Sequence, residues 1–297
     1  MAARRVLVTG CRGQLGADLC ELLGREHEVR GISRQDCDIR DRDAVRSGIG
    51  QFRPEFVLHT AAWTNVDGCE ADPDQAMAVN AYGTENVARA CREIGAALVY
   101  YSSDYVFDGA KSSPYIETDS PSPLSHYGRS KLAGEEAVAR SLDDFIIVRI
   151  AWVYGKVGRN FVRTMVRLGR EQMRQAREDN TVDPLTVASD QIGNPTWTYE
   201  IARQTIVLLA SDIRGIVHAA SEGETSWYGL ATRTFQELSL PVVVRPCTTE
   251  EFPRLAPRPR RSSLENRRLK EAGLNVMRPW DIALAEFLKR TGDALLT

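Results

Sequence analysis

The fold of this chain is decided near its N-terminus, by the stretch Arg5-Val6-Leu7-Val8-Thr9-Gly10-Cys11-Arg12-Gly13-Gln14-Leu15-Gly16. Its unbroken apolar run predicts a buried strand over Arg5–Thr9, and the leucine spacing that follows predicts a helix over Leu15–Leu23. A glycine-rich turn between a strand and a helix is the setting in which this pattern binds a dinucleotide. The three glycines would, in order, make the tight turn, let a pyrophosphate approach the backbone and let the helix pack closely on the strand.

Short apolar runs alternate with helical patterns through the rest of the first half. This alternation predicts an α/β fold, a Rossmann-type doubly wound parallel sheet with helices on both faces. The further strands are expected at Glu28–Ile32, Phe56–Thr60, Ala97–Ser102 and Phe145–Ile150, and the helices at Asp41–Phe52, Asp74–Ile94 and Tyr127–Ser141.

The second half is less regular and contains more proline and more turn signals. We therefore expect a dinucleotide-binding domain over residues 1–150 and a smaller α/β substrate-binding lobe over residues 151–297, some of whose segments return to the main sheet. Its helices are expected at Asn160–Asp179, Tyr199–Ala210, Trp227–Leu238 and Pro279–Arg290, with a strand at Gly215–Ala220.

Composition excludes several classes of protein. The 297 residues are 43% hydrophobic and carry 38 basic and 40 acidic side chains, a net charge of −2 that leaves no electrostatic footprint for nucleic acid. No apolar run is long enough for a membrane span, and the N-terminus lacks a secretory pattern, so we expect a cytoplasmic protein. The six cysteines form no CxxC pair and the four histidines show no ligand spacing, so we expect no metal site.

The residues after the second strand bear on the choice of cofactor. An NAD site usually places an acidic residue about 20 positions after the glycine turn to hold the ribose diol. Here Ser33 and Arg34 follow the strand, and a guanidinium there could pair with a 2′-phosphate. This favours NADPH, while the nearby Asp36 and Asp38 leave NADH open.

Three polar residues suggest a proton-transfer site. Tyr127 and Lys131 lie four positions apart at the start of a predicted helix, so they share one face. A neighbouring ammonium would lower the pKa of the phenol. Ser103 follows the predicted strand Ala97–Ser102, at the sheet edge where ligands of open α/β folds bind, and its hydroxyl could donate to a substrate carbonyl.

These features, with several longer runs, resemble the extended short-chain dehydrogenase/reductase superfamily and, within it, the dTDP-4-dehydrorhamnose reductase family. The resemblance covers essentially the whole chain. The runs that point to the narrower family are Ser102-Ser103-Asp104-Tyr105-Val106-Phe107-Asp108-Gly109, Asp190-Gln191-Ile192-Gly193-Asn194-Pro195-Thr196 and Arg258-Pro259.

The resemblance implies NADPH-dependent reduction of the C4 ketone of dTDP-4-dehydro-L-rhamnose. Tyr127 would protonate the C4 oxygen, Lys131 would hold the nicotinamide ribose, and Ser103 would hydrogen-bond the ketone. By the same resemblance, residues that would contact the substrate are Ser103, Asp104, Tyr105, Trp152, Asn194, Thr196 and Arg258. Residues that would contact the cofactor are Gly10, Gly13, Gln14, Leu15, Gly16, Ser33, Arg34, Asp38, Ile39, Ala61, Ala62, Tyr127 and Lys131.

Related activities remain open to different degrees. Sugar-nucleotide dehydratases carry Asp-Glu where this chain has Asp104-Tyr105, so the second acid needed for elimination is missing. A reductase or epimerase for another nucleotide-linked keto sugar stays open, as does a non-catalytic regulatory subunit of the same fold. The resemblance also leaves a homodimer open.

Overall fold

Six parallel strands form the central sheet, in the order β10-β5-β4-β3-β1-β2. The computed structural model describes residues 3–178 and 182–296. The chain runs from β1 outward to β2, then crosses back to β3 on the other side of β1, which confirms the doubly wound sheet. The strands are β1 (Arg5–Thr9), β2 (Glu28–Ile32), β3 (Phe56–His59), β4 (Ala97–Ser103), β5 (Phe145–Ile150) and β10 (Gly215–His218).

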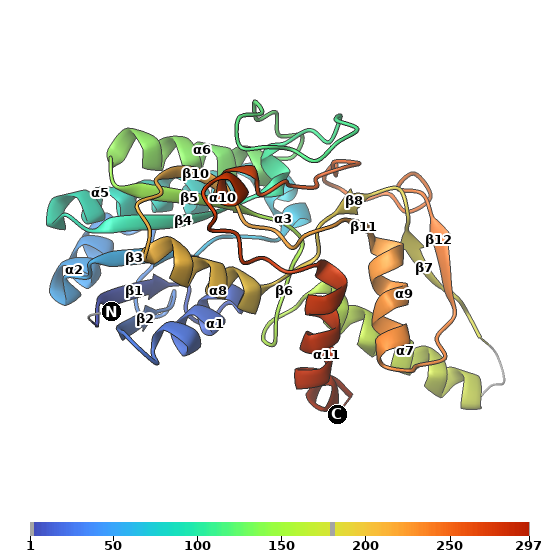
Figure 1. Cartoon of the computed structure of the whole chain (residues 1–297). Helices are drawn as coiled ribbons and strands as arrows, with labels where there is room; N and C mark the ends of the chain where they lie inside the picture. Colours follow the sequence, from blue (N-terminus) through green and yellow to red (C-terminus); the bar gives the residue numbers. More distant parts are fainter. Residues whose placement is uncertain (1–2, 179–181, 297) are drawn as a thin grey trace.

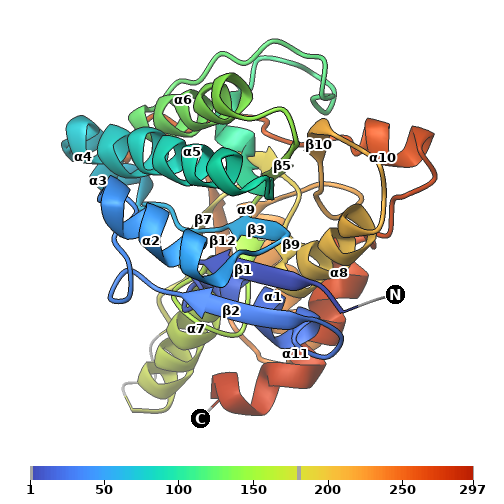
Figure 2. The same ribbon diagram turned by 90° about the vertical axis from the view of Figure 1, so that its left-hand side faces the viewer.

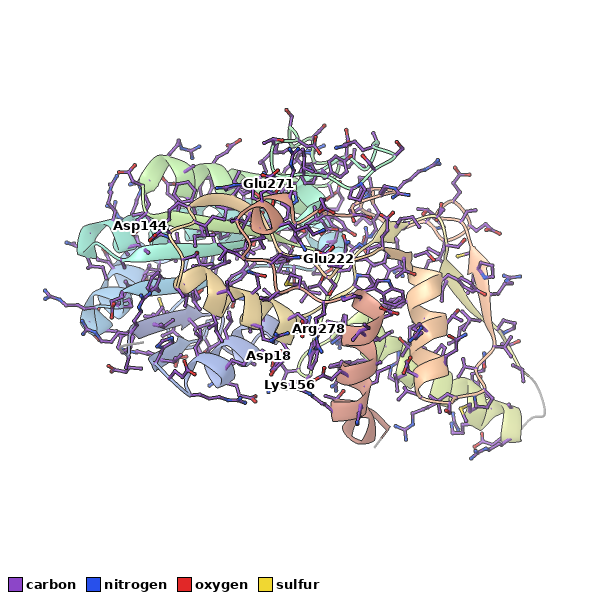
Figure 3. All side chains as sticks on the ribbon, in the orientation of Figure 1. Asp18, Asp144, Lys156, Glu222, Glu271 and Arg278 are labelled. Atoms are coloured by element: carbon purple, nitrogen blue, oxygen red, sulfur yellow. The ribbon has the colours of Figure 1, made fainter. Side chains whose placement is uncertain are left out.

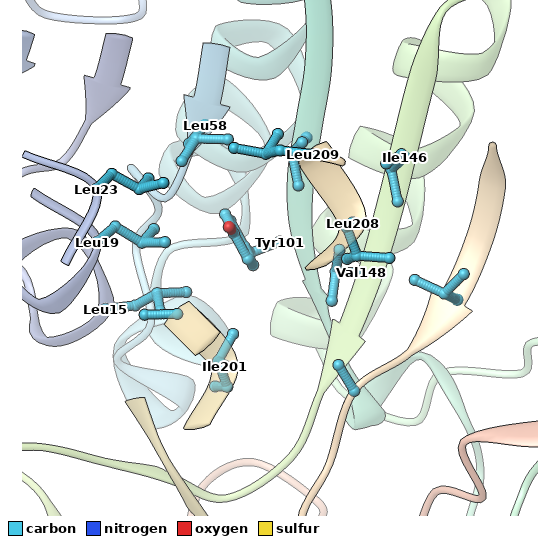
Figure 4. Packing of buried hydrophobic residues seen from close by; sticks show 14 of the residues in the cluster. Leu15, Leu19, Leu23, Leu58, Tyr101, Ile146, Val148, Ile201, Leu208 and Leu209 are labelled. Carbon is cyan, nitrogen blue, oxygen red and sulfur yellow. The ribbon is translucent and has the colours of Figure 1, made fainter. Parts of the chain in front are cut away.

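Helices cover both faces of this sheet (Figures 1 and 2). Alternate side chains of β1 point to opposite faces: Val6 and Val8 join one apolar cluster, and Leu7 joins the other. Figure 4 shows the first cluster, in which leucines of α1 pack beside residues of the sheet and of α8. One face carries α1 (Gln14–Leu23) and α8 (Thr198–Leu209), and the other carries α2 (Arg42–Phe52), α5 (Thr84–Ile94) and α6 (His126–Ser141).

The helix expected over Asp74–Ile94 is interrupted. It begins as α4 (Pro73–Met77), widens into a π-helical segment, η1 (Ala78–Gly83), and continues as α5. Within the π-helical segment, the Asn80 side chain accepts from Trp63 N and donates to Ser130 Oγ of α6. Hydrophobic spacing could not predict this segment, because its polar contacts reach residues distant in sequence.

The second half forms a smaller lobe of helices and short paired strands (Figure 1). The two-stranded pairs were not predicted, because strands of two to four residues show no periodicity. Segments of the second half return to the main sheet: β10 pairs with β5, and α8 packs on the face that also carries α1. The division at residue 150 stays a prediction. The remaining elements are α3 (Val66–Ala71), η2 (Asp104–Val106), β6 (Val153–Tyr154), α7 (Phe161–Glu178), β7 (Leu185–Ala188), β8 (Ile192–Gly193), β9 (Thr196–Trp197), β11 (Thr225–Ser226), α9 (Trp227–Glu237), β12 (Val244–Cys247), α10 (Arg267–Glu271) and α11 (Trp280–Leu296).

Polar contacts tie the two halves together. The Asp18 carboxylate of α1 accepts from the Thr198 hydroxyl at the start of α8 and lies 3.5 Å from the Lys156 ammonium. Figure 3 shows Asp18 and Lys156 side by side below the sheet. The start of α1 is therefore held against the segment that leads into α7. None of the described helices is long and apolar enough to cross a bilayer.

Candidate active site

Ser103 lies where β4 ends and the single turn η2 begins. Every residue of β4 is buried, and the Ser103 hydroxyl caps η2 by accepting from Tyr105 N at 3.2 Å. The same hydroxyl donates to Asp104 Oδ1 at 3.0 Å. A carboxyl group at this buried position is costly to ionise, and burial raises the pKa of Asp104 to about 7.

Tyr127 is brought to Ser103 by close packing of α6 on η2. Ser125 caps α6 by accepting from Gly128 N, which places Tyr127 in the first turn. A Cβ on Gly128 would lie 2.1 Å from the Tyr105 carbonyl oxygen, so only glycine allows this approach. The result is an edge-to-face contact between the rings of Tyr105 and Tyr127, whose centroids are 5.6 Å apart.

Lys131 is almost fully buried one turn further along α6. Its ammonium donates to the Tyr101 carbonyl oxygen at 2.7 Å and lies 4.2 Å from the centre of the Tyr100 ring. Burial lowers the pKa of Lys131 to about 7, and the nearby Glu135 carboxylate acts in the opposite direction. The largest effect on the Tyr127 pKa is burial, which raises it, while hydrogen bonding with Ser103 lowers it. The pKa of Tyr127 is thus raised, and not lowered as expected from the neighbouring Lys131, because burial of the phenol outweighs the other effects. The phenol therefore keeps its proton at neutral pH.

Ser103, Tyr127 and Lys131 line one cavity of about 610 Å³. Asp104, Tyr105 and Trp152 line it as well. Trp152 has a left-handed backbone conformation (φ 44°), which is uncommon for a non-glycine residue and often marks a functional site.

Trp227 of α9 also lines this cavity, although no sequence motif singled it out. Its indole stacks flat on that of Trp152, with centroids 3.6 Å apart. The indole nitrogens of the two residues are anchored by Ser262 and Gln191 respectively. The two residues lie 75 positions apart, so no local pattern could have paired them.

The glycine-rich turn opens into the same cavity. Gly10 has φ 67°, and a Cβ there would lie 2.8 Å from Ala61 N. A Cβ on Gly16 would lie 2.3 Å from the Gly10 carbonyl oxygen. No side chain caps α1, so the amides of its first turn are available to an anion. Gly13, Gln14, Leu15 and Gly16 all line the 610 Å³ cavity. These features fit a dinucleotide pyrophosphate.

A second cavity of about 550 Å³ continues from the turn toward the end of β2. It shares Gly13, Thr60 and Ala62 with the first. The sequence-predicted residues that line it are Gly10, Gly13, Ser33, Arg34, Asp38, Ile39, Ala61 and Ala62. The two adjoining cavities together fit an extended dinucleotide cofactor.

The charged residues of this second cavity include two arginines that sequence reasoning missed, Arg12 and Arg40. Arg40 holds Asp38 in an ion pair at 2.6 Å and lowers the pKa of that carboxyl to about 2. Arg34 is largely exposed and lies 3.6 Å from the same carboxylate. For Arg12, its position inside the glycine-rich turn was the feature of the sequence that could have indicated a place in this cavity.

Three sequence-predicted substrate residues are not among those that line the 610 Å³ cavity. Asn194 and Thr196 are buried, and their side chains bond backbone groups of the segments around them. Arg258 forms an ion pair with Asp67 at 3.0 Å. A role for these three residues in binding substrate stays a prediction.

Comparison with known sequences gives consistent relatives. Residues 4–292 match a family described as the RmlD substrate binding domain. The chain is 44% identical over 285 residues to a dTDP-4-keto-6-deoxy-D-glucose reductase of Streptomyces niveus, covering 95% of this chain and 96% of that protein. It is 43% identical over 290 residues to a dTDP-4-dehydrorhamnose reductase of Streptomyces griseus, covering 95% and 92%.

Comparison with solved structures also finds a dTDP-4-dehydrorhamnose reductase. A dTDP-4-dehydrorhamnose reductase of Bacillus anthracis, solved in complex with NADP, superimposes with a TM-score of 0.92 at 36% identity, over 97% of this chain and all of that one. A UDP-glucose 4-epimerase of Thermus thermophilus in complex with NAD has a TM-score of 0.81 at 23% identity, over 98% of this chain and 99% of the other. At that identity the epimerase shows a shared fold alone.

Proposed function

This chain belongs to the RmlD substrate-binding domain family, and we propose that it reduces the C4 ketone of dTDP-4-dehydro-L-rhamnose to give dTDP-L-rhamnose, with NADPH as reductant. The observation that carries the proposal is the meeting of Ser103, Tyr127 and Lys131 in one cavity, which the glycine-rich turn also lines. A ketone placed there would be within reach of a proton donor and of the cofactor cleft.

When bound, NADPH would supply the hydride for the C4 carbon, with its pyrophosphate held at the turn formed by Gly10, Gly13 and Gly16. The Tyr127 phenol gives its proton to the C4 oxygen, so the ketone gains one hydride and one proton and becomes an alcohol. Ser103 fixes the ketone by hydrogen bonding, and its contact with Asp104 holds the hydroxyl in place. Lys131 holds a positive charge one helical turn from the phenol, where it stabilises the phenolate that remains. The paired indoles of Trp152 and Trp227 form an apolar side of the cavity.

The direct test is NADPH consumption by the purified chain in the presence of dTDP-4-dehydro-L-rhamnose. We expect rapid consumption, with dTDP-L-rhamnose as the product. If NADPH binds but is not consumed, the chain is not this reductase.

Reduction of a different dTDP-linked 4-keto sugar is the second candidate. The Streptomyces niveus relative, which is named as acting on dTDP-4-keto-6-deoxy-D-glucose, supports it. Supplying both keto sugars separately and comparing the kcat/KM values distinguishes the two. The sugar that gives the higher kcat/KM is the substrate.

We expect Arg34 to contribute to the preference for NADPH, because it lies beside the 550 Å³ cavity near the end of β2. A charged hydrogen bond to the 2′-phosphate is worth about 1.5–3 kcal/mol, or roughly tenfold to a hundredfold in affinity. Arg34→Ala should therefore raise the dissociation constant of NADPH by about this factor and leave that of NADH nearly unchanged. Both constants can be measured from cofactor fluorescence. An equal loss for NADPH and NADH would assign Arg34 no role at the 2′-phosphate.

The activity should fall as the pH rises above about 7. Burial lowers the pKa of Lys131 to about 7, so the ammonium form is present below this pH and is lost above it. The measurement is kcat/KM between about pH 6 and 9. Arginine keeps its charge throughout this range, so Lys131→Arg should flatten the profile even where it lowers the rate. A wild-type profile that stays level to about pH 9 would contradict the assignment.

A further inference from the structure

One face of α7 carries a line of arginines that the proposed chemistry does not use. Arg163, Arg167, Arg170, Arg174 and Arg177 follow one another at spacings of four, three, four and three residues. This spacing keeps all five on one side of a helix. The opposite side is buried, with Val162, Met165, Val166, Gly169 and Gln172 turned inward. We call the five residues the arginine stripe.

The charge of this region departs from that of the whole chain. Residues 156–178 contain seven basic and two acidic side chains, whereas the full chain has a net charge of −2. Both of those acids, Glu171 and Glu178, pair with Arg174. Within the described part of the chain, no carboxylate lies within 4.0 Å of Arg163, Arg167 or Arg170. The stripe therefore keeps most of its positive charge.

The arginine stripe begins at the catalytic cavity. It lines a groove of about 1300 Å³ together with Gly158 and Arg159. Gly158 and Arg159 also line the 610 Å³ cavity that holds Ser103 and Tyr127. Figures 1 and 2 show α7 leading away from the sheet at the edge of the molecule. The 18 residues of α7 span about 27 Å, whereas the screening length of exposed charges is about 8 Å at physiological ionic strength. The stripe therefore carries positive charge well beyond the reach of charges at the cavity itself.

We propose that the arginine stripe attracts the diphosphate of the sugar nucleotide and guides it into the catalytic cavity. This rests on the proposed function, which makes the substrate a nucleoside diphosphate sugar. The stripe offers charge complementary to the diphosphate, and the groove is continuous with the site where the sugar reacts. A line of like charge leading to a cleft raises the local concentration of an oppositely charged ligand and speeds its association. NADPH carries the same pyrophosphate chemistry and is therefore the necessary comparison.

The test is the association rate of dTDP, followed by quenching of the fluorescence of Trp152 and Trp227, which line the catalytic cavity. The variant is Arg167→Glu/Arg170→Glu, which changes two exposed side chains outside the catalytic machinery. The new carboxylates lie four residues from Arg163 and Arg174, and these favourable pairs offset the like charge of Glu171, which is four residues from position 167. The matched control is Arg92→Glu/Arg140→Glu, which makes the same change in net charge at exposed positions of α5 and α6.

At an ionic strength of about 0.01 M we expect the stripe variant to bind dTDP about tenfold more slowly than wild type, and the control to change less than about twofold. At about 1 M the difference should vanish, because the screening length falls to about 3 Å. Equal slowing in both variants would show an effect of net charge alone and overturn the proposal. A slower association of dTDP that persists at high salt would also overturn the proposal, as would a slowing seen with NADPH and not with dTDP.

The experiment separates this proposal from the proposed function, because dTDP association requires no turnover. If the chain reduces neither keto sugar but shows the salt-dependent difference in dTDP association, the proposed reductase function is contradicted and the role of the arginine stripe stands. A confirmed reductase in which both variants bind dTDP as wild type does would lose only the role of the arginine stripe.

Discussion

Replacing Tyr127 with phenylalanine should lower kcat by about a hundredfold to ten-thousandfold, the usual contribution of a positioned general acid. The substitution removes only the phenolic oxygen, so the ring keeps its edge-to-face contact with Tyr105 and the helix keeps its cap. The proton for the C4 oxygen would then have to come from water, which this buried position admits poorly. Steady-state reduction of the dTDP-linked keto sugar measures the loss.

Tyr101→Phe is the matched control for this prediction. Tyr101 also lines the catalytic cavity, but its hydroxyl is 2.8 Å from Thr205 Oγ1 rather than free to reach a substrate. Lys131 contacts the Tyr101 backbone carbonyl, which the substitution keeps. We expect the control to stay within about threefold of wild type and both variants to bind NADPH normally. A Tyr127→Phe enzyme that retains most of its kcat, or that loses NADPH binding, would contradict the role of proton donor.

Local patterns predicted the fold well because the first half repeats one simple unit. The strands at Arg5–Thr9, Glu28–Ile32 and Phe145–Ile150 end where the apolar runs predicted. Buried parallel strands are continuous apolar runs, and the glycine turn fixes where the first helix begins. The meeting of Ser103 with Tyr127 followed from the same logic, because the carboxyl ends of parallel strands face one edge of the sheet.

What escaped prediction depends on contacts between segments distant in the chain. Gly128 looks like a poor helix residue in the sequence, yet it is what lets α6 reach η2. Trp227 becomes part of the cavity only because α9 packs beside the turn that carries Trp152. Arg40 lines the 550 Å³ cavity together with Gln75 of α4, whose side-chain oxygen accepts a hydrogen bond from the Arg40 guanidinium at 3.2 Å. None of these relations leaves a periodic trace.

Replacing Glu135 with glutamine should cost the fold about 3–5 kcal/mol, the usual effect of breaking a buried ion pair from one side. Glu135 and Arg149 are both almost fully buried, and two hydrogen bonds at 2.9 and 2.7 Å join them. Glutamine cannot neutralise the guanidinium, which stays buried with its charge uncompensated. Urea unfolding gives the loss in free energy. The double variant Glu135→Leu/Arg149→Met removes both charges and should regain most of the stability, whereas a double variant as unstable as the single one would contradict this account.

The same substitution should also reach the active site, because Glu135 lies one helical turn beyond Lys131 and opposes the effect of burial on its pKa. Without that carboxylate, the charged form of Lys131 is less stable, so the pKa of Lys131 falls further. The decline of kcat/KM with rising pH should therefore begin at a lower pH in folded Glu135→Gln than in wild type. A purely structural role for Glu135 predicts less folded enzyme with an unchanged pH profile, so the profile, normalised to the folded fraction, decides whether the buried pair also sets the charge of the catalytic lysine.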